Sequence, residues 1–385
     1  MRGLSPRERV LRALDHREPD RIPISFAGTF CSGIVQLGDR GYTDLCTYLG
    51  IQDYAKPELS ELFNIVTNVD ERLMERFGSD FRAITPAIPP AKIEPDGTKT
   101  WEVMCGMRIK NIGTYDEPYD FPLSNYESVK DVEGYPWPDP DDFDIANGKR
   151  EEARKLHENT DYAVVGESFF SSMPFNVYAQ IGGMDKWLID MKIRPKLYFA
   201  ICDRLLEYGL AMDAKFYEAV GNYIDIAVMF DDLGAQNGPL MSYQDWAKFV
   251  RPYTKQIIAN IKRYTSAKIL MHNCGSIYTF IPGLAEIGVD AVHGVMPLAW
   301  HMEPWRLKKD FGDIMTFFGG IDIQRLLPYG RIEEVREGVR KTIEAYASAG
   351  GYILAPAHNL EPDTLPQNIV GMYEAAQEFG KYPIG

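Results

Sequence analysis

The stretch that indicates the fold of this chain is Lys268-Ile269-Leu270-Met271-His272-Asn273-Cys274-Gly275, a short apolar run that ends in His-x-Cys-Gly. Such a run is typical of a buried β-strand, in which successive side chains point to opposite faces. His272 and Cys274, two positions apart, are therefore expected to point the same way. An imidazole beside a thiolate suits zinc, whereas the alternative is a core histidine next to an ordinary buried cysteine. Because two ligands do not complete a site, a third must come from elsewhere.

The same pattern, an apolar strand followed at once by polar residues, recurs along the chain. We expect further strands at 22–26, 162–166, 224–230, 289–292, 314–318 and 352–355. Amphipathic stretches between strands, such as 243–263, 277–287 and 332–348, predict helices. Short strands that alternate with helices indicate a parallel sheet. No GxGxxG or P-loop fingerprint follows a strand, which weakens the case for a nucleotide-binding doubly wound sheet.

The polar residues that follow these strands favour a closed α/β barrel over an open sheet. In a (β/α)8 barrel, the carboxyl ends of all strands converge on one mouth, where the active site lies. A barrel would bring together Glu167, Asp231, Asp322 and the His272/Cys274 pair. It would also supply His358 as the missing ligand. We therefore predict a metal site of His272, Cys274 and His358, while Asp231 and Asp232 have the alternative role of helix N-caps.

Two segments are expected outside the repeating pattern. Ser5-Pro6-Arg7-Glu8 predicts a helix start, with Ser as N-cap and Pro at the first helical position. The turn signal Glu94-Pro95-Asp96-Gly97, flanked by residues of period two, predicts an antiparallel hairpin at about 93–113. The predicted architecture is thus one TIM-barrel domain over residues 1–385, with an N-terminal helical extension and a β-hairpin insertion.

The composition indicates a globular protein that acts on a small molecule or a protein partner. The chain has 385 residues and a formal net charge of −14, which argues against nucleic acid and anionic membrane as partners. No apolar run approaches the roughly 20 residues of a membrane-spanning helix, and the N-terminus lacks the apolar core of a signal peptide. Five scattered cysteines do not resemble a disulfide framework. We expect a cytoplasmic protein.

Taken together, the motifs resemble the uroporphyrinogen decarboxylase-like superfamily, and within it the branch of corrinoid-dependent methyltransferases. The matching stretches are 7–14, 18–23, 231–239, 271–277, 318–324 and 350–364. The resemblance implies a TIM barrel that binds zinc and moves a methyl group to or from the cobalt of a corrinoid, which a separate corrinoid-binding protein supplies.

This chain departs from the pattern of that superfamily at two places. Coenzyme M-methylating members typically hold zinc by His-x-Cys and a distant Cys, whereas here His358 stands in the position of that Cys. Porphyrinogen-decarboxylating members carry an arginine-rich segment after the first strand, whereas this chain has Gly28-Thr29-Phe30-Cys31-Ser32-Gly33. Haem-pathway decarboxylation is therefore not expected.

The sequence favours demethylation of a small methylated compound, for example a methoxylated aromatic. A His/Cys/His set carries less negative charge than His/Cys/Cys, which leaves zinc more electrophilic towards a leaving oxygen. Glu167 or Asp231 would deliver a proton. Asp232, Gln236, Asn237, Tyr243, Asp322 and Asn359 are candidate substrate-binding residues, and Phe169, Phe170, Phe175, Tyr243 and Trp300 are candidate pocket aromatics.

The sequence is compatible with three alternatives. The first is thiol methylation of the coenzyme M type, in which zinc would activate a thiol as thiolate. The second is a zinc-free decarboxylase of a small organic acid, with Asp231 stabilising a developing cation. The third is a non-catalytic scaffold for a corrinoid protein, against which the intact His-x-Cys weighs.

Overall fold

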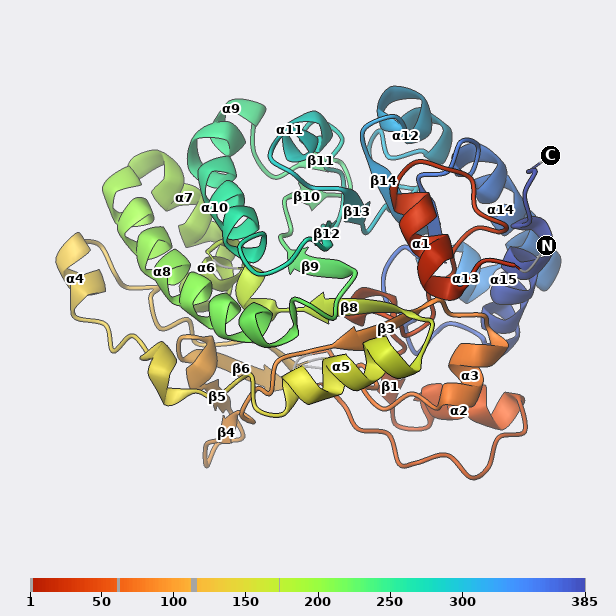
Figure 1. Cartoon of the computed structure of the whole chain (residues 1–385). Coiled ribbons are helices and arrows are strands. Elements are labelled where there is room, and N and C mark those ends of the chain that lie inside the picture. The colour runs from red at the N-terminus through yellow and green to blue at the C-terminus, as the bar shows by residue number, and fades with distance from the viewer. Residues whose placement is uncertain (1–2, 61–62, 112–115, 173, 385) are drawn as a thin grey trace.

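Parallel strands that alternate with helices form the central sheet in the computed structural model of this chain, which describes residues 3–60, 63–111, 116–172 and 174–384 (Figure 1). In spatial order the seven strands are β3 (Phe81–Ile84), β8 (Ala163–Glu167), β9 (Ile226–Phe230), β12 (Lys268–His272), β13 (Ala291–His293), β14 (Thr316–Ile321) and β15 (Tyr352–Pro356). Each strand lies beside the next one along the chain, as in a TIM barrel.

The gap between the first and last strands is closed by the extended segment 22–26, which was predicted as a strand. Ile24 forms a parallel bridge with Leu354 of β15, and on the other side its carbonyl accepts the backbone N–H of Asp80 at 2.8 Å. The segment makes isolated bridges instead of a full ladder because its N–H groups bond to side chains. Ile24 donates to the carboxylate of Asp80, and Phe26 donates to the hydroxyl of Ser79.

Helices cover the outer face of the barrel (Figure 1). They include α5 (Lys149–Asn159), α6 (Phe175–Gly182), α7 (Met184–Ile193), α8 (Pro195–Val220), α10 (Arg251–Ile261), α11 (Ile281–Glu286), α12 (Pro304–Phe311), α14 (Ile332–Tyr346) and α15 (Pro366–Phe379). The helix expected at 243–263 contains a π-helical turn at Trp246–Val250. π-Helical turns occur mostly as single-turn bulges of this kind within α-helices. Within the described residues, no helix combines the length and the apolar character needed to cross a bilayer.

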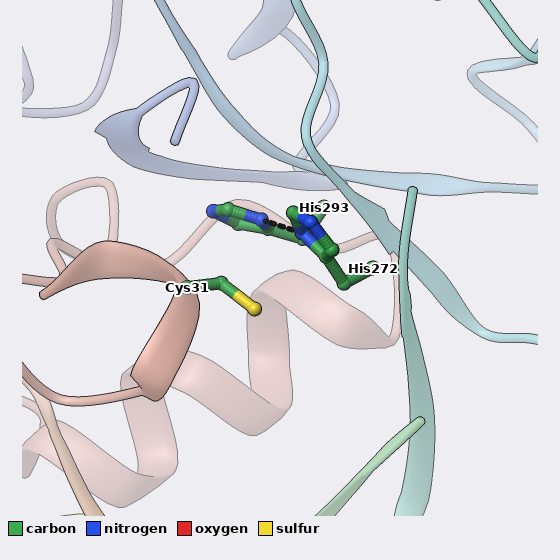
Figure 2. Close-up of side chains that lie close together, drawn as sticks. All are labelled: Cys31, His272 and His293. Atoms are coloured by element: carbon green, nitrogen blue, oxygen red, sulfur yellow. Dashed lines mark hydrogen bonds between the residues drawn. The ribbon is translucent and has the colours of Figure 1, made fainter. Parts of the chain in front are cut away.

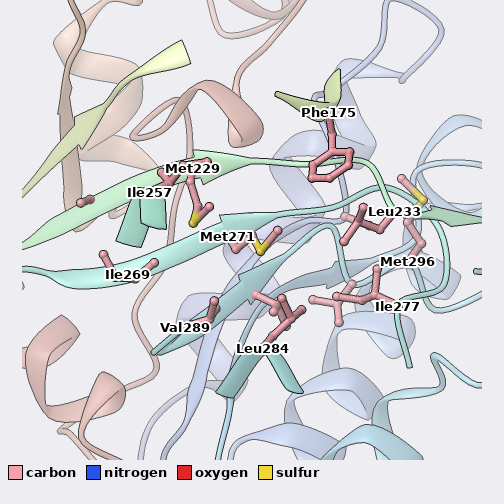
Figure 3. Close-up of a cluster of buried hydrophobic side chains, with 14 of the residues drawn as sticks. Phe175, Met229, Leu233, Ile257, Ile269, Met271, Ile277, Leu284, Val289 and Met296 are labelled. Atoms are coloured by element: carbon pink, nitrogen blue, oxygen red, sulfur yellow. The ribbon is translucent and has the colours of Figure 1, made fainter. Parts of the chain in front are cut away.

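Alternation along the strands separates two apolar layers. Val228, Leu270 and Phe318 belong to the cluster inside the barrel. Met229, Ile269 and Met271 point the other way and pack beneath the helices (Figure 3). Because neighbouring side chains of a strand face opposite sides, this alternation decides which residue after each strand reaches the barrel mouth.

The helix predicted at the N-terminus is confirmed, and the predicted antiparallel insertion is present but is larger than the expected hairpin. Helix α1 (Pro6–Leu14) begins with a capping box between Ser5 and Glu8. The insertion is a four-stranded antiparallel sheet, larger than a hairpin, of β4 (Lys92–Ile93), β5 (Lys99–Trp101), β6 (Met107–Asn111) and β7 (Asp116–Pro118). The predicted end of the hairpin at Gly113 lies outside the described residues.

We predict that Asp80 is critical for barrel closure. Its fully buried carboxylate accepts hydrogen bonds from Arg9 of α1 at 2.6 Å, from Arg21 at 2.8 and 2.9 Å, and from the backbone of Ile24 at 2.9 Å. Asp80→Asn removes the counter-charge of Arg21 and leaves Arg9 with Asp20 as its remaining carboxylate partner. Breaking a buried ion pair in this way typically costs about 3–5 kcal/mol. Urea unfolding measures the loss. Glu158→Gln, which removes the exposed partner of Arg154, is the control and should change stability little. Equal effects of the two variants would contradict this role.

Candidate metal centre

Three predicted ligand residues meet at the carboxyl ends of two strands. His272 is the last residue of β12, Cys274 follows two positions later, and His358 follows the end of β15. One ligand atom of each lies within 4.8 Å of the others, and the Sγ of Cys274 is 3.5 Å from the Nε2 of His272. The structure thus brings the predicted triad together, and a small shift of these side chains would place all three around one ion.

The loop after β12 is held in place by its neighbours. Asp232, which follows β9, accepts the backbone N–H of Cys274 at 2.8 Å, and its Oδ1 lies 3.9 Å from Nε2 of His272. Gly294, after β13, has φ +83, and a Cβ there would lie 1.9 Å from the carbonyl oxygen of Asn273. Only glycine therefore allows the loops after β12 and β13 to approach this closely.

Burial sets the protonation of the triad in the absence of a metal. It lowers the pKa of His272, and it lowers the pKa of His358 to about 4. Both imidazoles are therefore neutral at neutral pH, with a lone pair free for a metal. Burial, and then the negative charge of Asp232, raise the pKa of the Cys274 thiol well above its usual range. Two neutral nitrogens and one sulfur form a donor set that fits zinc.

The triad opens on an apolar cavity of about 430 Å³. Its walls include Phe30, Phe63, Trp101, Met104, Phe169 and Phe230. Phe169 stacks on Phe230 at 5.3 Å between ring centroids, and Phe30 meets Phe169 edge-on at 4.9 Å. Trp101 and Met104 come from the antiparallel insertion, which therefore forms part of the cavity wall. Asp232 and Asn359, two of the predicted substrate-binding residues, also line it.

The predicted acids Glu167 and Asp231 do not line this cavity in the described structure. Asp231 is buried, and its charge acts on the thiol of Cys202 in α8, consistent with a side chain on the helix side of β9. Glu167 is buried beneath the loop after segment 22–26, where both carboxylate oxygens accept the N–H of Phe30 at 2.9 Å.

The remaining predicted residues lie further from the triad. Gln236 and Asn237 are exposed in the turn between β10 (Gly234–Ala235) and β11 (Gly238–Pro239). Asp322 caps α13 (Leu326–Tyr329), since its carboxylate accepts the N–H groups of Gln324 and Leu326. The predicted aromatics Tyr243 and Trp300 are about two-fifths exposed, while Phe170 and Phe175 are core residues. Of the predicted aromatics, Phe169 alone lines the cavity.

Sequence reasoning missed two residues beside the triad, His293 and Cys31. His293 is the last residue of β13, and its Nδ1 lies 2.8 Å from the Nδ1 of His272. Cys31, in the short 3₁₀ turn Phe30–Ser32, lines the cavity. The signal for His293 was present, because it follows a predicted strand as His272 does. No comparable pattern marks Cys31, which reaches the mouth only through barrel closure.

We predict that Glu167 makes the folded state sensitive to alkaline pH. Burial raises its pKa from the ordinary 4.5 to about 8, although the hydrogen bond from Phe30 opposes the shift. The unfolded chain loses this proton near pH 4.5 and the folded chain near pH 8, so its contribution to stability is lost as pH rises through that window. The side chain of the Glu167→Gln variant does not titrate. The melting temperature of the variant, relative to that of the wild type, should therefore increase as the pH rises from 5 to 8.5. Exposed Glu207→Gln is the control, and a pH-independent difference for Glu167→Gln would contradict the assignment.

Comparisons with known proteins agree with the architecture and the motifs. A model of the uroporphyrinogen decarboxylase (URO-D) family matches residues 124–379. Uroporphyrinogen decarboxylase of Geobacter metallireducens is 25% identical over 192 residues, which are 50% of this chain and 52% of that protein. The methylated-thiol–coenzyme M methyltransferase of Methanosarcina mazei is 25% identical over 171 residues, which are 44% of this chain and 42% of that protein. The chain thus spans about half the length of the curated relatives it matches.

A solved structure supports the same fold over nearly the whole chain. The methyltransferase from Methanosarcina mazei superimposes with a TM-score of 0.68 and 18% identity, covering 98% of this chain and 99% of that one. This likeness confirms the barrel, and the family model covers well over half of the sequence. The chain therefore belongs to the uroporphyrinogen decarboxylase (URO-D) family.

Proposed function

We propose that this protein is a zinc-dependent methyltransferase that moves a methyl group between a small methylated substrate and the corrinoid of a partner protein. The observation that carries the proposal is the His272/Cys274/His358 triad in the lining of an apolar cavity. The methyltransferase names of two similar proteins support the same reaction type.

The chain's own residues would hold the metal and keep water from the reacting atoms. His272, Cys274 and His358 would hold zinc, which when bound would supply a Lewis acid for the leaving oxygen of a methyl ether. Asp232 positions Cys274 through its backbone N–H. Phe30, Phe169 and Phe230 form an aromatic wall that would pack against a substrate ring and exclude water.

The charge of the cavity favours an uncharged substrate. Among the described residues that line it there is no lysine or arginine, and Asp232 is the one acidic side chain. An anionic substrate would be buried there without a counter-charge, which is costly. This weighs against decarboxylation of a small organic acid and against coenzyme M, which carries a sulfonate. An uncharged aryl methyl ether suits the walls better.

We further propose that the corrinoid belongs to a separate protein that docks over the barrel mouth. A cavity of about 430 Å³ accommodates a small substrate and not a corrin ring. Methyl transfer to cobalt would then cross the interface between the two proteins at the mouth, directly above the triad.

Metal analysis tests the zinc site. We expect one zinc per chain in protein purified without chelator, and Cys274→Ala should lose stoichiometric zinc because two histidines bind it weakly. Cys105→Ala removes a buried thiol outside the cavity and is the matched control, which should keep its zinc. Full zinc occupancy in Cys274→Ala would refute the ligand assignment.

A spectroscopic assay tests the reaction and the substrate charge. The enzyme is mixed with reduced corrinoid protein and a methoxyphenol, and conversion of Co(I) to methyl-Co(III) is followed. We expect the uncharged methoxyphenol to react at least about tenfold faster than the methoxybenzoate of similar size, since burying an unpaired carboxylate costs more than 1.4 kcal/mol. Release of carbon dioxide from an acid, with no methyl transfer from any ether, amine or thiol, would favour the decarboxylase.

A further inference from the structure

A second group of ligand-type side chains shares His272 with the triad. Cys31, His272 and His293 each offer a ligand atom within 4.8 Å of the others, and all three are buried. Figure 2 shows the Cys31 side chain below the two imidazole rings, which come from neighbouring strands. His272 and His293 are register partners in β12 and β13, so the parallel pairing itself places their rings side by side.

The distance between the two rings distinguishes a hydrogen bond from a second metal site. The two Nδ1 atoms are 2.8 Å apart. Two nitrogens bound to one tetrahedral zinc at about 2.0–2.1 Å would lie about 3.3–3.4 Å apart. A separation of 2.8 Å is short for shared ligation and ordinary for a hydrogen bond. One of the two nitrogens therefore carries a hydrogen and donates a hydrogen bond to the other.

The triad decides which nitrogen is the donor. The Nε2 of His272 faces Cys274 at 3.5 Å and Asp232 at 3.9 Å, so this is the nitrogen that would bind a metal. A neutral imidazole with a free Nε2 carries its proton on Nδ1. His272 then donates from Nδ1, and His293 accepts with its own Nδ1. His293 must in turn carry its proton on Nε2, an atom that is buried and has no hydrogen-bond partner in the described structure.

We propose that His293 is a positioning residue that fixes His272 in the tautomer whose Nε2 faces the metal seat. Metal-binding histidines usually donate their second N–H to a carboxylate, a carbonyl or water. A neutral imidazole as acceptor fixes the tautomer without adding negative charge to the ligand. This inference rests on the proposed zinc site, and it explains how the site would retain an electrophilic metal while holding the ligand rigidly.

The tautomers can be observed without any reaction. The chain has six histidines, so histidine-selective ¹⁵N labelling gives a small set of ring signals. In the zinc-loaded protein we expect His272 protonated on Nδ1 and His293 protonated on Nε2. Before zinc is added, the Nδ1-to-Nδ1 hydrogen bond should already be present. A zinc-loaded protein with His293 protonated on Nδ1 would overturn the proposal.

Three substitutions at His293 separate positioning from packing, with zinc affinity measured by competition with a chelator. His293→Leu keeps bulk but removes the acceptor, and we expect a 10- to 100-fold loss of affinity. His293→Asn restores an acceptor oxygen near the place of Nδ1 and should recover most of the loss. His293→Asp supplies a charged acceptor, so affinity should equal or exceed that of the wild type while methyl transfer slows.

Phe318→Leu is the control for packing. The Phe318 ring contacts the His293 ring edge-on, with 5.0 Å between ring centroids, and cannot hydrogen-bond to it. It should leave zinc affinity within a few-fold of the wild type. Equal affinities for the Leu, Asn and wild-type proteins would overturn the positioning role. Two zinc ions per chain, with the second lost in Cys31→Ala, would also overturn it in favour of a second metal site. If the affinity order holds but no methyl donor reacts, the proposed function fails and the positioning role stands.

Discussion

The buried carboxylate of Asp80 is the interaction on which the geometry of the barrel mouth depends. It joins Arg9 of α1, Arg21, and Ile24 of the closing segment 22–26 to the start of β3. Closure in turn sets the path of the next residues, so that Phe30 donates its N–H to Glu167 at the end of β8 and Gly33 donates its N–H to Asn359 after β15. The loop after segment 22–26 thus spans the mouth, and the cavity owes one aromatic wall and the Cys31 thiol to it.

Register is the second constraint, because it sets which side chains share a level inside the barrel. Phe230, His272 and His293 are register partners across β9, β12 and β13. With side chains of period two, Asp232 reaches the mouth while Asp231 faces the helices. The same pairing positions both the ligand His272 and its hydrogen-bond partner on β13. No loop is needed to bring the two side chains together. Strand pairing therefore builds the His272–His293 pair, while Cys274 and His358 come from the loops after β12 and β15.

Much of the fold and the triad could be predicted because each rests on a local pattern. Apolar runs and the polar residues after them predicted β12 and β15, and with them His272, Cys274 and His358. Strand β3 was missed because it has four residues and contains Arg82, whose side chain packs over the Tyr162 ring. The prediction of Asp231 as a catalytic acid is not supported, because Phe230 faces the inside of the barrel and the period of two then brings Asp232 to the cavity. His293 was passed over because its partner lies across the sheet, and no spacing in the sequence shows that.

The protonation state of the buried thiols and of Glu167 links metal binding to the stability of the fold. Burial raises the pKa of Cys31, of Cys274 and of Glu167, and neighbouring acids contribute for the two thiols. No lysine or arginine among the described residues lines the cavity to counter this. A divalent ion in the triad would reverse the balance at Cys274, because ligation favours the thiolate and releases its proton. Ligands and fold would then be stabilised together, since an ion that binds the folded chain in preference to the unfolded chain raises its stability. Burial thus keeps the metal-free Cys274 thiol protonated, and a bound cation would supply the positive charge that stabilises its thiolate.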